Sequence, residues 1–221
     1  PDIEAILQAG DFGPGAAIGI HGKATNIGRK VLSSWSVTPG AYNYGRAAVM
    51  LNSALREELY PKHAGFTDGV TGSQNRRYRE RVTVVRHNNI TFVPKTCKTH
   101  RSIAVEPLLN SYIQKGIDDL MRLRLKRLGI NLSDQSLNQR LAREGSVDDS
   151  EDGFVTIDLA SASDSVATEV VRTVLPPEWF ELLNSTRSKS YMLDGKLNTY
   201  HKFCSMGNGF CFPLETLLFT T

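Results

Sequence analysis

The feature that most constrains this chain is the stretch Gly153–Val166, which reads GFVTIDLASASDSV. Its apolar and β-branched residues 154–157 predict a short strand, and Asp158 follows at the strand's end. Small residues then lead to a second carboxylate, Asp164, before a helical pattern. A strand-end acid followed by a small-residue turn predicts a platform for a divalent ion and phosphates. The segment alone leaves a structural alternative, in which Asp158 forms a turn and Asp164 caps the next helix.

Length and composition predict a globular protein. The chain has 221 residues, 40% of them hydrophobic and 22% charged, enough for one large domain or two small ones. No apolar run approaches the ~18 residues of a membrane span, and no secretory signal is recognisable. The three cysteines form no CxxC pair and the five histidines lie far apart, which argues against zinc and for a reducing cytoplasm. The chain opens at Pro1 without Met and closes directly after a helical pattern, so we expect a fragment of a longer protein.

Positive charge is concentrated in one segment. Residues 76–101 hold eight Lys/Arg against one acid, a charge of +7, and with a chain total of +3 the remaining residues carry −4. Within this segment Lys95, Lys98 and Arg101 lie in PKTCKTHR, which we expect to be an extended basic ribbon. The uneven charge predicts a polyanionic ligand at one place.

Periodicity and turn signals predict the other elements. We expect a long helix from Leu108 to Leu128 and a hairpin around Asp194-Gly195. The remaining expectations are a helix over 38–60, a loop over 65–74, a hairpin of strands 81–86 and 90–93, a helix from Ser133 to Arg143, a short helix around 179–183, and a Gly loop, 205–209, that enters a helix near 212.

Three kinds of part now need one explanation: a carboxylate pair, a basic ribbon and a polar Gly loop. Phosphoryl transfer from a nucleoside triphosphate needs carboxylates for divalent ions and cations for the triphosphate. It also needs a mobile polar loop that fits the sugar and the template.

The motifs resemble those of a known enzyme family. TIDLASASDSV resembles polymerase motif A, PKTCKTHRSIAVEP resembles the basic motif F, and SMGNGFCFPLE resembles motif B. Together they resemble the RNA-dependent RNA polymerase of positive-strand RNA bacteriophages, the levivirus replicase catalytic subunit. The resemblance covers most of the chain, including FGPGA and DQSLNQRLAREGS.

The resemblance implies an α+β, right-handed polymerase fold, truncated before motif C and the thumb. Residues 1–104 would form a fingers region with the motif F ribbon, and 105–221 an incomplete palm with intervening fingers elements and motifs A and B. Asp158 would be the catalytic, metal-binding aspartate. Asp164, Ser205, Gly207, Asn208 and Gly209 would bind nucleotide, ribose or template, and Lys95, Lys98 and Arg101 the triphosphate and RNA.

The resemblance also implies a function: replication of a phage RNA genome by two-metal nucleotidyl transfer from NTPs, with Mg²⁺ or alternatively Mn²⁺. Partners would be RNA template and product, NTPs and host translation factors, in the host bacterial cytoplasm and without a membrane. The Gly-Asp-Asp of motif C is missing, so the fragment alone is expected to be inactive. Cys211 stands where Thr is expected and Pro213 where relatives carry an acid, which puts a sugar contact from residue 211 in doubt.

Two other functions stay open. A reverse transcriptase shares the palm, but it typically places a bulky aromatic residue after the motif A aspartate, and this sequence has none between Asp158 and Asp164. A non-catalytic RNA-binding module would explain the basic segment but not the pair of acids. A Gly-Asp-Asp between apolar strands, further along the parent reading frame, would identify the polymerase.

Overall fold

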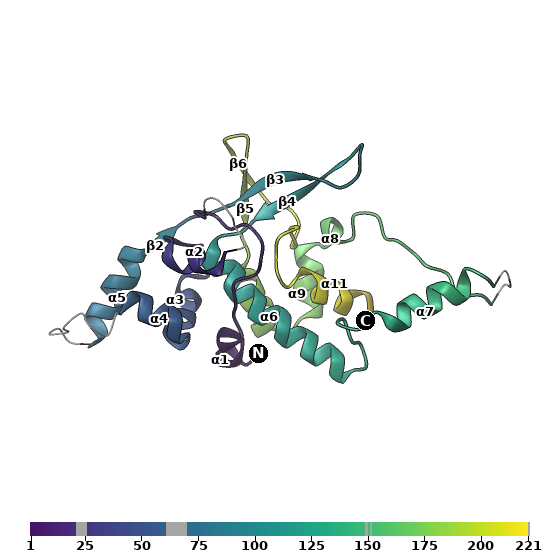
Figure 1. Ribbon diagram of the computed structural model, residues 1–221, viewed down its shortest axis with the longest axis horizontal. Coiled ribbons are helices and arrows are strands. Elements are labelled where there is room, and N and C mark those ends of the chain that lie inside the picture. Colours follow the sequence, from purple (N-terminus) through teal and green to yellow (C-terminus); the bar gives the residue numbers. More distant parts are fainter. Residues whose placement is uncertain (21–25, 61–69, 149, 151, 221) are drawn as a thin grey trace.

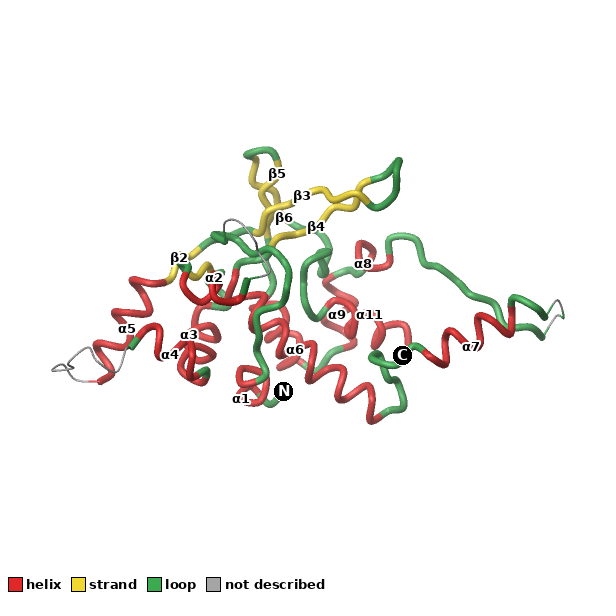
Figure 2. Tube along the Cα trace, in the orientation of Figure 1, coloured by secondary structure: helices red, strands yellow, loops and turns green. Residues whose placement is uncertain are grey.

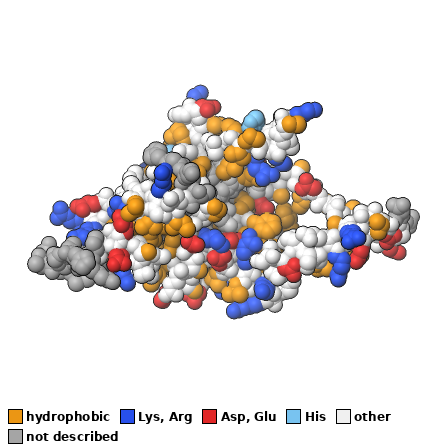
Figure 3. Space-filling view, in the orientation of Figure 1, with side chains coloured by type: hydrophobic (Ala, Val, Ile, Leu, Met, Phe, Trp, Pro, Cys, Tyr) orange, Lys and Arg blue, Asp and Glu red, His pale blue; other side chains and the backbone are white. Residues whose placement is uncertain are grey.

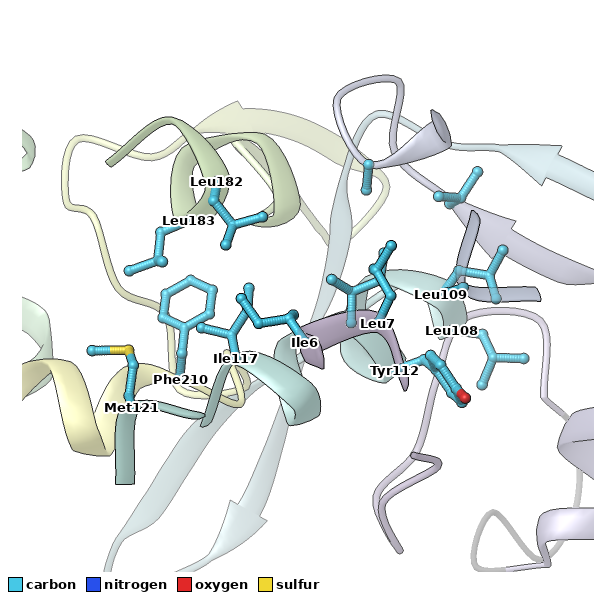
Figure 4. Packing of buried hydrophobic residues seen from close by; sticks show 14 of the residues in the cluster. Ile6, Leu7, Leu108, Leu109, Tyr112, Ile117, Met121, Leu182, Leu183 and Phe210 are labelled. Carbon is cyan, nitrogen blue, oxygen red and sulfur yellow. The ribbon is translucent and has the colours of Figure 1, made fainter. Parts of the chain in front are cut away.

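The long helix α6 (Leu108–Arg127) is the centre of the fold, as its apolar periodicity predicted. The structure is a computed structural model that describes residues 1–20, 26–60, 70–148, 150 and 152–220. Leu109, Ile113 and Ile117 are fully buried in α6, whereas Leu128, expected in the same stripe, is 74% exposed. Side chains from α1 (Ile3–Gln8), α6, α10 (Pro177–Thr186) and the loop before α11 (Cys211–Thr220) meet in the core (Figure 4).

Short helices build the N-terminal half. They are α2 (Ile27–Leu32), α3 (Tyr42–Leu51), α4 (Ser53–Leu59) and α5 (Val70–Arg81). The single helix expected over 38–60 is therefore wrong: the chain breaks at Asn52, whose side chain accepts a hydrogen bond from the Leu55 amide and caps α4. The loop expected over 65–74 is wrong for 70–74, which are helical, and 65–69 lie outside the described residues.

The strands pair differently from the prediction. β1 (Trp35–Val37) pairs in parallel with β2 (Val82–Val84), and a second sheet has the order β4-β3-β5-β6. The first hairpin is thus β3 (Asn88–Pro94) with β4 (His100–Val105), and strands 81–86 and 90–93 do not pair with each other. The predicted Asp194-Gly195 hairpin is confirmed as β5 (Ser190–Leu193) and β6 (Lys196–Thr199). Figure 1 shows the β3–β4 hairpin projecting above the helices.

The described part of the C-terminal half carries five further helices besides α6. α7 (Ser136–Gly145) has its N-cap at Gln135 and not at the expected Ser133, and it buries no residue. α10 and α11 pack on α6, while α8 (Ala162–Ser165) lies against α11 and α9 (Thr168–Val174) against α10 (Figure 1). The strand expected over 154–157 is wrong. These residues run through an unpaired segment between α7 and α8 (Figure 2) because no described strand lies beside them to share backbone hydrogen bonds. The fold is a mixed α/β fold.

Candidate functional site

The Gly loop, residues Ser205–Gly209, is held in one conformation by the side chain of Asn208. Its Oδ1 accepts hydrogen bonds from the amide of Ser205 at 2.8 Å and from the Ser205 hydroxyl at 3.1 Å. Both residues are buried, and among the described groups the Asn208 Nδ2 finds no hydrogen-bond partner. A buried amide donor without a partner is unfavourable, so the loop carries one uncompensated donor.

The same loop docks on the β3–β4 hairpin and on α6. The Met206 carbonyl accepts a hydrogen bond from the Ala104 amide at 2.9 Å, and the Gly209 amide donates to Gln114 Oε1 at 3.0 Å. A Cβ at Gly207 would lie only 1.9 Å from the Ala104 carbonyl oxygen, so this position requires glycine. The predicted loop is therefore confirmed as a loop that enters a helix, but it is fastened at both ends.

Asp164 lies in the first turn of α8 with its carboxylate exposed and ion-paired to Lys202. The alternative in which Asp164 caps a helix is wrong, because the N-cap positions of the two short helices are Ser161 and Ala167. Next to the ion pair, the Phe203 amide donates to the Val166 carbonyl at 2.8 Å. These two contacts join the end of motif A to the segment that leads into motif B.

A cleft of about 470 Å³ opens beside this junction. Asp164 and Lys202 line it together with residues of the β3–β4 and β5–β6 hairpins: Ile90, Phe92, Ser102, Tyr191, Leu193, Thr199, Tyr200 and His201. Burial raises the pKa of Tyr200 to about 12, so its phenol is protonated and donates to Asn88 Oδ1 at 2.9 Å. The cleft thus combines a carboxylate, an ammonium and aromatic rings, which suits a charged ligand with a planar group.

Asp158 is exposed in the unpaired segment that follows Gly153. The rigid strand-end platform expected for it is therefore not formed by the described residues. Among all the residues that the structure describes, no group of three or more His, Cys, Asp or Glu is arranged to hold a metal ion. One exposed carboxylate supplies only one part of the octahedral oxygen shell of Mg²⁺, so the described residues alone do not complete a metal site.

The predicted basic ribbon is a hairpin tip. Lys95 and Lys98 lie in the turn between β3 and β4, where the Thr96 hydroxyl accepts hydrogen bonds from the amides of Lys98 and Thr99. Arg101 is the second residue of β4, opposite Val93. All three cations are exposed, and Figure 3 shows Lys and Arg atoms at the projecting tip.

The β3–β4 hairpin separates Asp164 from Arg101, two of the predicted site residues. Side chains alternate along a strand, so Phe92 and Ser102 share the face that lines the Asp164 cleft, whereas Arg101 and Val93 share the other. That other face lines a second cavity of about 430 Å³, which also includes Gly207 and Gly209 of the Gly loop. The structure brings Asp164 near motif B and places Arg101 on the opposite face.

A buried polar network behind the hairpin was not predicted to be part of the site. The Glu106 carboxylate accepts hydrogen bonds from Asn88 Nδ2 at 2.5 Å, Ser188 Oγ at 3.1 Å and Gln114 Nε2 at 3.3 Å. Burial raises the pKa of Glu106, and the three donors oppose this shift. The sequence signal was a pair of amides four residues apart, Asn110 and Gln114, on the apolar face of α6.

Comparisons with known proteins show the family to which this chain is similar. A family model described as RNA replicase, beta-chain, matches residues 2–221. The RNA-directed RNA polymerase beta chain of Escherichia phage MS2 is 39% identical over 210 residues, which are 94% of this chain and 35% of that protein. The corresponding chain of Enterobacteria phage GA is 36% identical over 217 residues, 97% of this chain and 37% of that protein. The RNA-directed RNA polymerase subunit beta of Enterobacteria phage SP is 48% identical over 141 residues, 63% and 24% of the two chains.

This chain spans about a third of the length of the phage MS2 and GA proteins. The match nevertheless runs through nearly all of its residues, and it agrees with the resemblance of its three motifs. The chain belongs to the RNA replicase beta-chain family of RNA bacteriophages.

Proposed function

We propose that this chain is part of an RNA-directed RNA polymerase that replicates a phage RNA genome, and that it holds the ribose and triphosphate of the incoming nucleotide and part of the RNA. Its relatives are named RNA-directed RNA polymerases, which supports the reaction class. We place the fingers in residues 1–104 and an incomplete palm in residues 105–221. Motif C and the thumb would lie in the part of the replicase that this chain, about a third as long as the phage MS2 and GA proteins, does not span.

The observation that carries the proposal is the junction of motifs A and B. Asp164, an acceptor, ion-pairs with Lys202, and the buried Asn208 three positions beyond Ser205 keeps a free Nδ2 donor. A ribose hydroxyl can donate a hydrogen bond, so the exposed Asp164 acceptor in the cleft suits its recognition. Asn208 belongs to the Gly loop, whose Gly207 and Gly209 line the cavity on the other face of the hairpin, and we assign the loop to template or sugar contacts from that side. Ser205 positions Asn208, Gly207 keeps the loop backbone close to Ala104 of the hairpin, and Gly209 keeps it close to Gln114 of α6.

The cations supply the remaining chemistry. Lys95, Lys98 and Arg101 project from the hairpin and would neutralise triphosphate or RNA phosphates. Because Arg101 shares a face with the Gly-loop cavity, we assign it to phosphates on that side of the hairpin. Lys95 and Lys98 at the tip would contact RNA on approach.

Polymerases of this class use Mg²⁺ or Mn²⁺ in a two-metal reaction. The described residues do not by themselves form such a site. We propose only that Asp158 supplies one oxygen ligand in the full-length replicase and that this chain alone is inactive. The partners in the proposal are RNA template and product, NTPs and host translation factors, in the cytoplasm of the bacterial host. None of the described helices is long and apolar enough to cross a membrane.

The test is template-directed RNA synthesis by the full-length replicase carrying Asp158→Asn. This change keeps the side-chain size and removes the charge, so we expect nucleotide incorporation to be lost while circular dichroism stays unchanged. Asp152→Asn is the matched control, because Asp152 is also exposed and lies in the same region outside motif A. Substantial synthesis by Asp158→Asn in Mg²⁺ would contradict the metal-ligand role.

A further inference from the structure

A third cavity, of about 340 Å³, lies away from both hairpin faces. Its lining comes from three segments: Thr38, Pro39 and Gly40 after β1, Arg86 after β2, and a third segment with Ser185 at the end of α10 and Arg187 and Lys189 between α10 and β5. β1 and β2 are parallel, and the Val85 amide donates to the Val37 carbonyl at 2.9 Å, so both strands deliver their following residues to the same end. None of these residues belongs to motifs A, B or F.

The walls of this cavity are fixed to each other by one buried amide. Asn110 of α6 accepts a hydrogen bond from the Thr38 amide at 2.9 Å and donates to the Thr38 hydroxyl and to the Thr186 carbonyl, each at 2.8 Å. Gly40 approaches so closely that an added Cβ would lie 2.6 Å from the Ser185 carbonyl oxygen. The Lys189 carbonyl accepts from the Tyr200 amide at 3.0 Å. The cavity is therefore preformed.

Arg187 is a buried cation whose described hydrogen-bond partners are all uncharged. Only 7% of it is exposed, its Nε donates to Asn184 Oδ1 at 3.0 Å, and its guanidinium stacks on Phe203 at 4.7 Å. Its Nη1 donates to the carbonyls of Lys202 at 3.4 Å and Phe203 at 3.5 Å. Within the described part of the chain, no carboxylate forms an ion pair with Arg187, Arg86 or Lys189. A buried charge is unfavourable unless an opposite charge accompanies it. The described lining of the cavity holds three cations and no acid, which leaves that place for an anion.

We propose that this cavity binds a phosphate of the RNA backbone, a contact outside the nucleotide-binding site. The planar fork of an arginine matches phosphate oxygens. Two exposed cations add charge: Lys189 from the same segment as Arg187, and Arg86 from the wall that follows β2. The inference rests on the proposed function, because it takes RNA as the polyanion that the replicase handles.

The lining also favours RNA backbone over a free nucleotide. No aromatic side chain of the described residues lines this cavity, so a base has nothing to stack on. Recognition through phosphate alone is independent of sequence, which is what a polymerase needs along its template or product.

The experiment measures binding of oligouridylate to the full-length replicase at several salt concentrations. Arg187 is left intact because it also supports the fold, and the variant is Arg86→Gln with Lys189→Gln. Each single-strand phosphate contact contributes about 0.7 to the slope of log affinity against log salt, so removing two lowers its magnitude by about 1.4. A charge-retaining pair, Arg86→Lys with Lys189→Arg, should keep the wild-type slope.

The matched control is Arg127→Gln with Lys126→Gln, two exposed cations at the end of α6 that do not line the cavity. A wild-type slope in the Arg86/Lys189 glutamine variant, or an equal loss in the control, overturns the proposal. A raised KM for UTP with an unchanged RNA slope also overturns it, in favour of a free triphosphate. Wild-type replicase that binds RNA without salt dependence counts against the proposed function itself.

Discussion

Replacing Asp164 with alanine separates a role in sugar choice from a role in stability. The Asp164 and Lys202 side chains are 47% and 28% exposed, and an ion pair at such a surface contributes about 0–1 kcal/mol. Asp164 caps neither α8 nor α9, so no capping energy is lost with it. We therefore expect the free energy of unfolding to fall by less than about 1 kcal/mol.

The expected effect on selectivity is larger. A hydrogen bond from a ribose hydroxyl to a carboxylate contributes about 1.5–3 kcal/mol, and 1.4 kcal/mol corresponds to a factor of ten. Asp164→Ala should therefore narrow the preference of the full-length replicase for ribo- over deoxynucleotides by about ten- to a hundredfold. The assay is competition between UTP and dUTP on one template, with urea unfolding measured in parallel.

Glu169→Ala is the matched control for this change. Glu169 forms an exposed ion pair with Arg172 in the first turn of α9 and does not line the Asp164 cleft. Glu169→Ala should lower the free energy of unfolding by a similarly small amount and leave the preference for ribonucleotides as in wild type. Unchanged selectivity in Asp164→Ala, or an equal loss in Glu169→Ala, would refute the reasoning.

Three further predictions concern the loop, the hairpin and the buried acid. Gly207→Ala should destabilise the protein by roughly 1–3 kcal/mol, seen in urea unfolding, because the new Cβ collides with the Ala104 carbonyl. Lys98→Ala with Arg101→Ala should weaken RNA binding and lower its salt slope, measured by titration of the full-length replicase with oligouridylate. Burial raises the pKa of Glu106, so the folded state binds its proton more tightly; the stability this gives is present below the unfolded pKa and is lost as pH rises from about 4.3 through the folded pKa. The free energy of unfolding, measured across that pH range, should fall more steeply with rising pH in wild type than in Glu106→Gln.

Each of these predictions has its own control. Gly13→Ala should be harmless, because nothing lies within 4 Å of a Cβ there; equal losses at both glycines would argue against the collision. Lys126→Ala with Arg127→Ala tests whether any two cations matter as much as the hairpin pair. A difference between wild type and Glu106→Gln that does not vary with pH would exclude titration of the buried carboxyl.

Local signals predicted the elements that local interactions decide. The Asp194-Gly195 turn formed where expected because both residues adopt positive φ, 49° and 75°, the conformation that Asp-Gly tolerates in a two-residue hairpin. The α6 helix followed from its apolar spacing. Asn52 was overlooked as a helix break, although its side chain is of the type that caps helices.

Pairing between distant segments could not be predicted in the same way. β2 pairs with β1, more than 40 positions earlier, and leaves β3 to pair with β4. Residues 154–157 have the composition of a strand, but a strand also needs a neighbour, and composition does not supply one. The candidate site follows the same pattern: the motifs supplied its candidate residues, whereas the register of β3 and β4 decided that Asp164 and Arg101 lie on opposite faces.

The β3–β4 hairpin is a wall shared by two spaces, one beside Asp164 and one beside Gly207. Its base is fixed to the Gly loop, because the Ala104 amide donates to the Met206 carbonyl at 2.9 Å and a Cβ at Gly207 would lie 1.9 Å from the Ala104 carbonyl oxygen. Since both spaces share this wall, a substitution that shifts the register of β3 against β4 changes the lining of both at once.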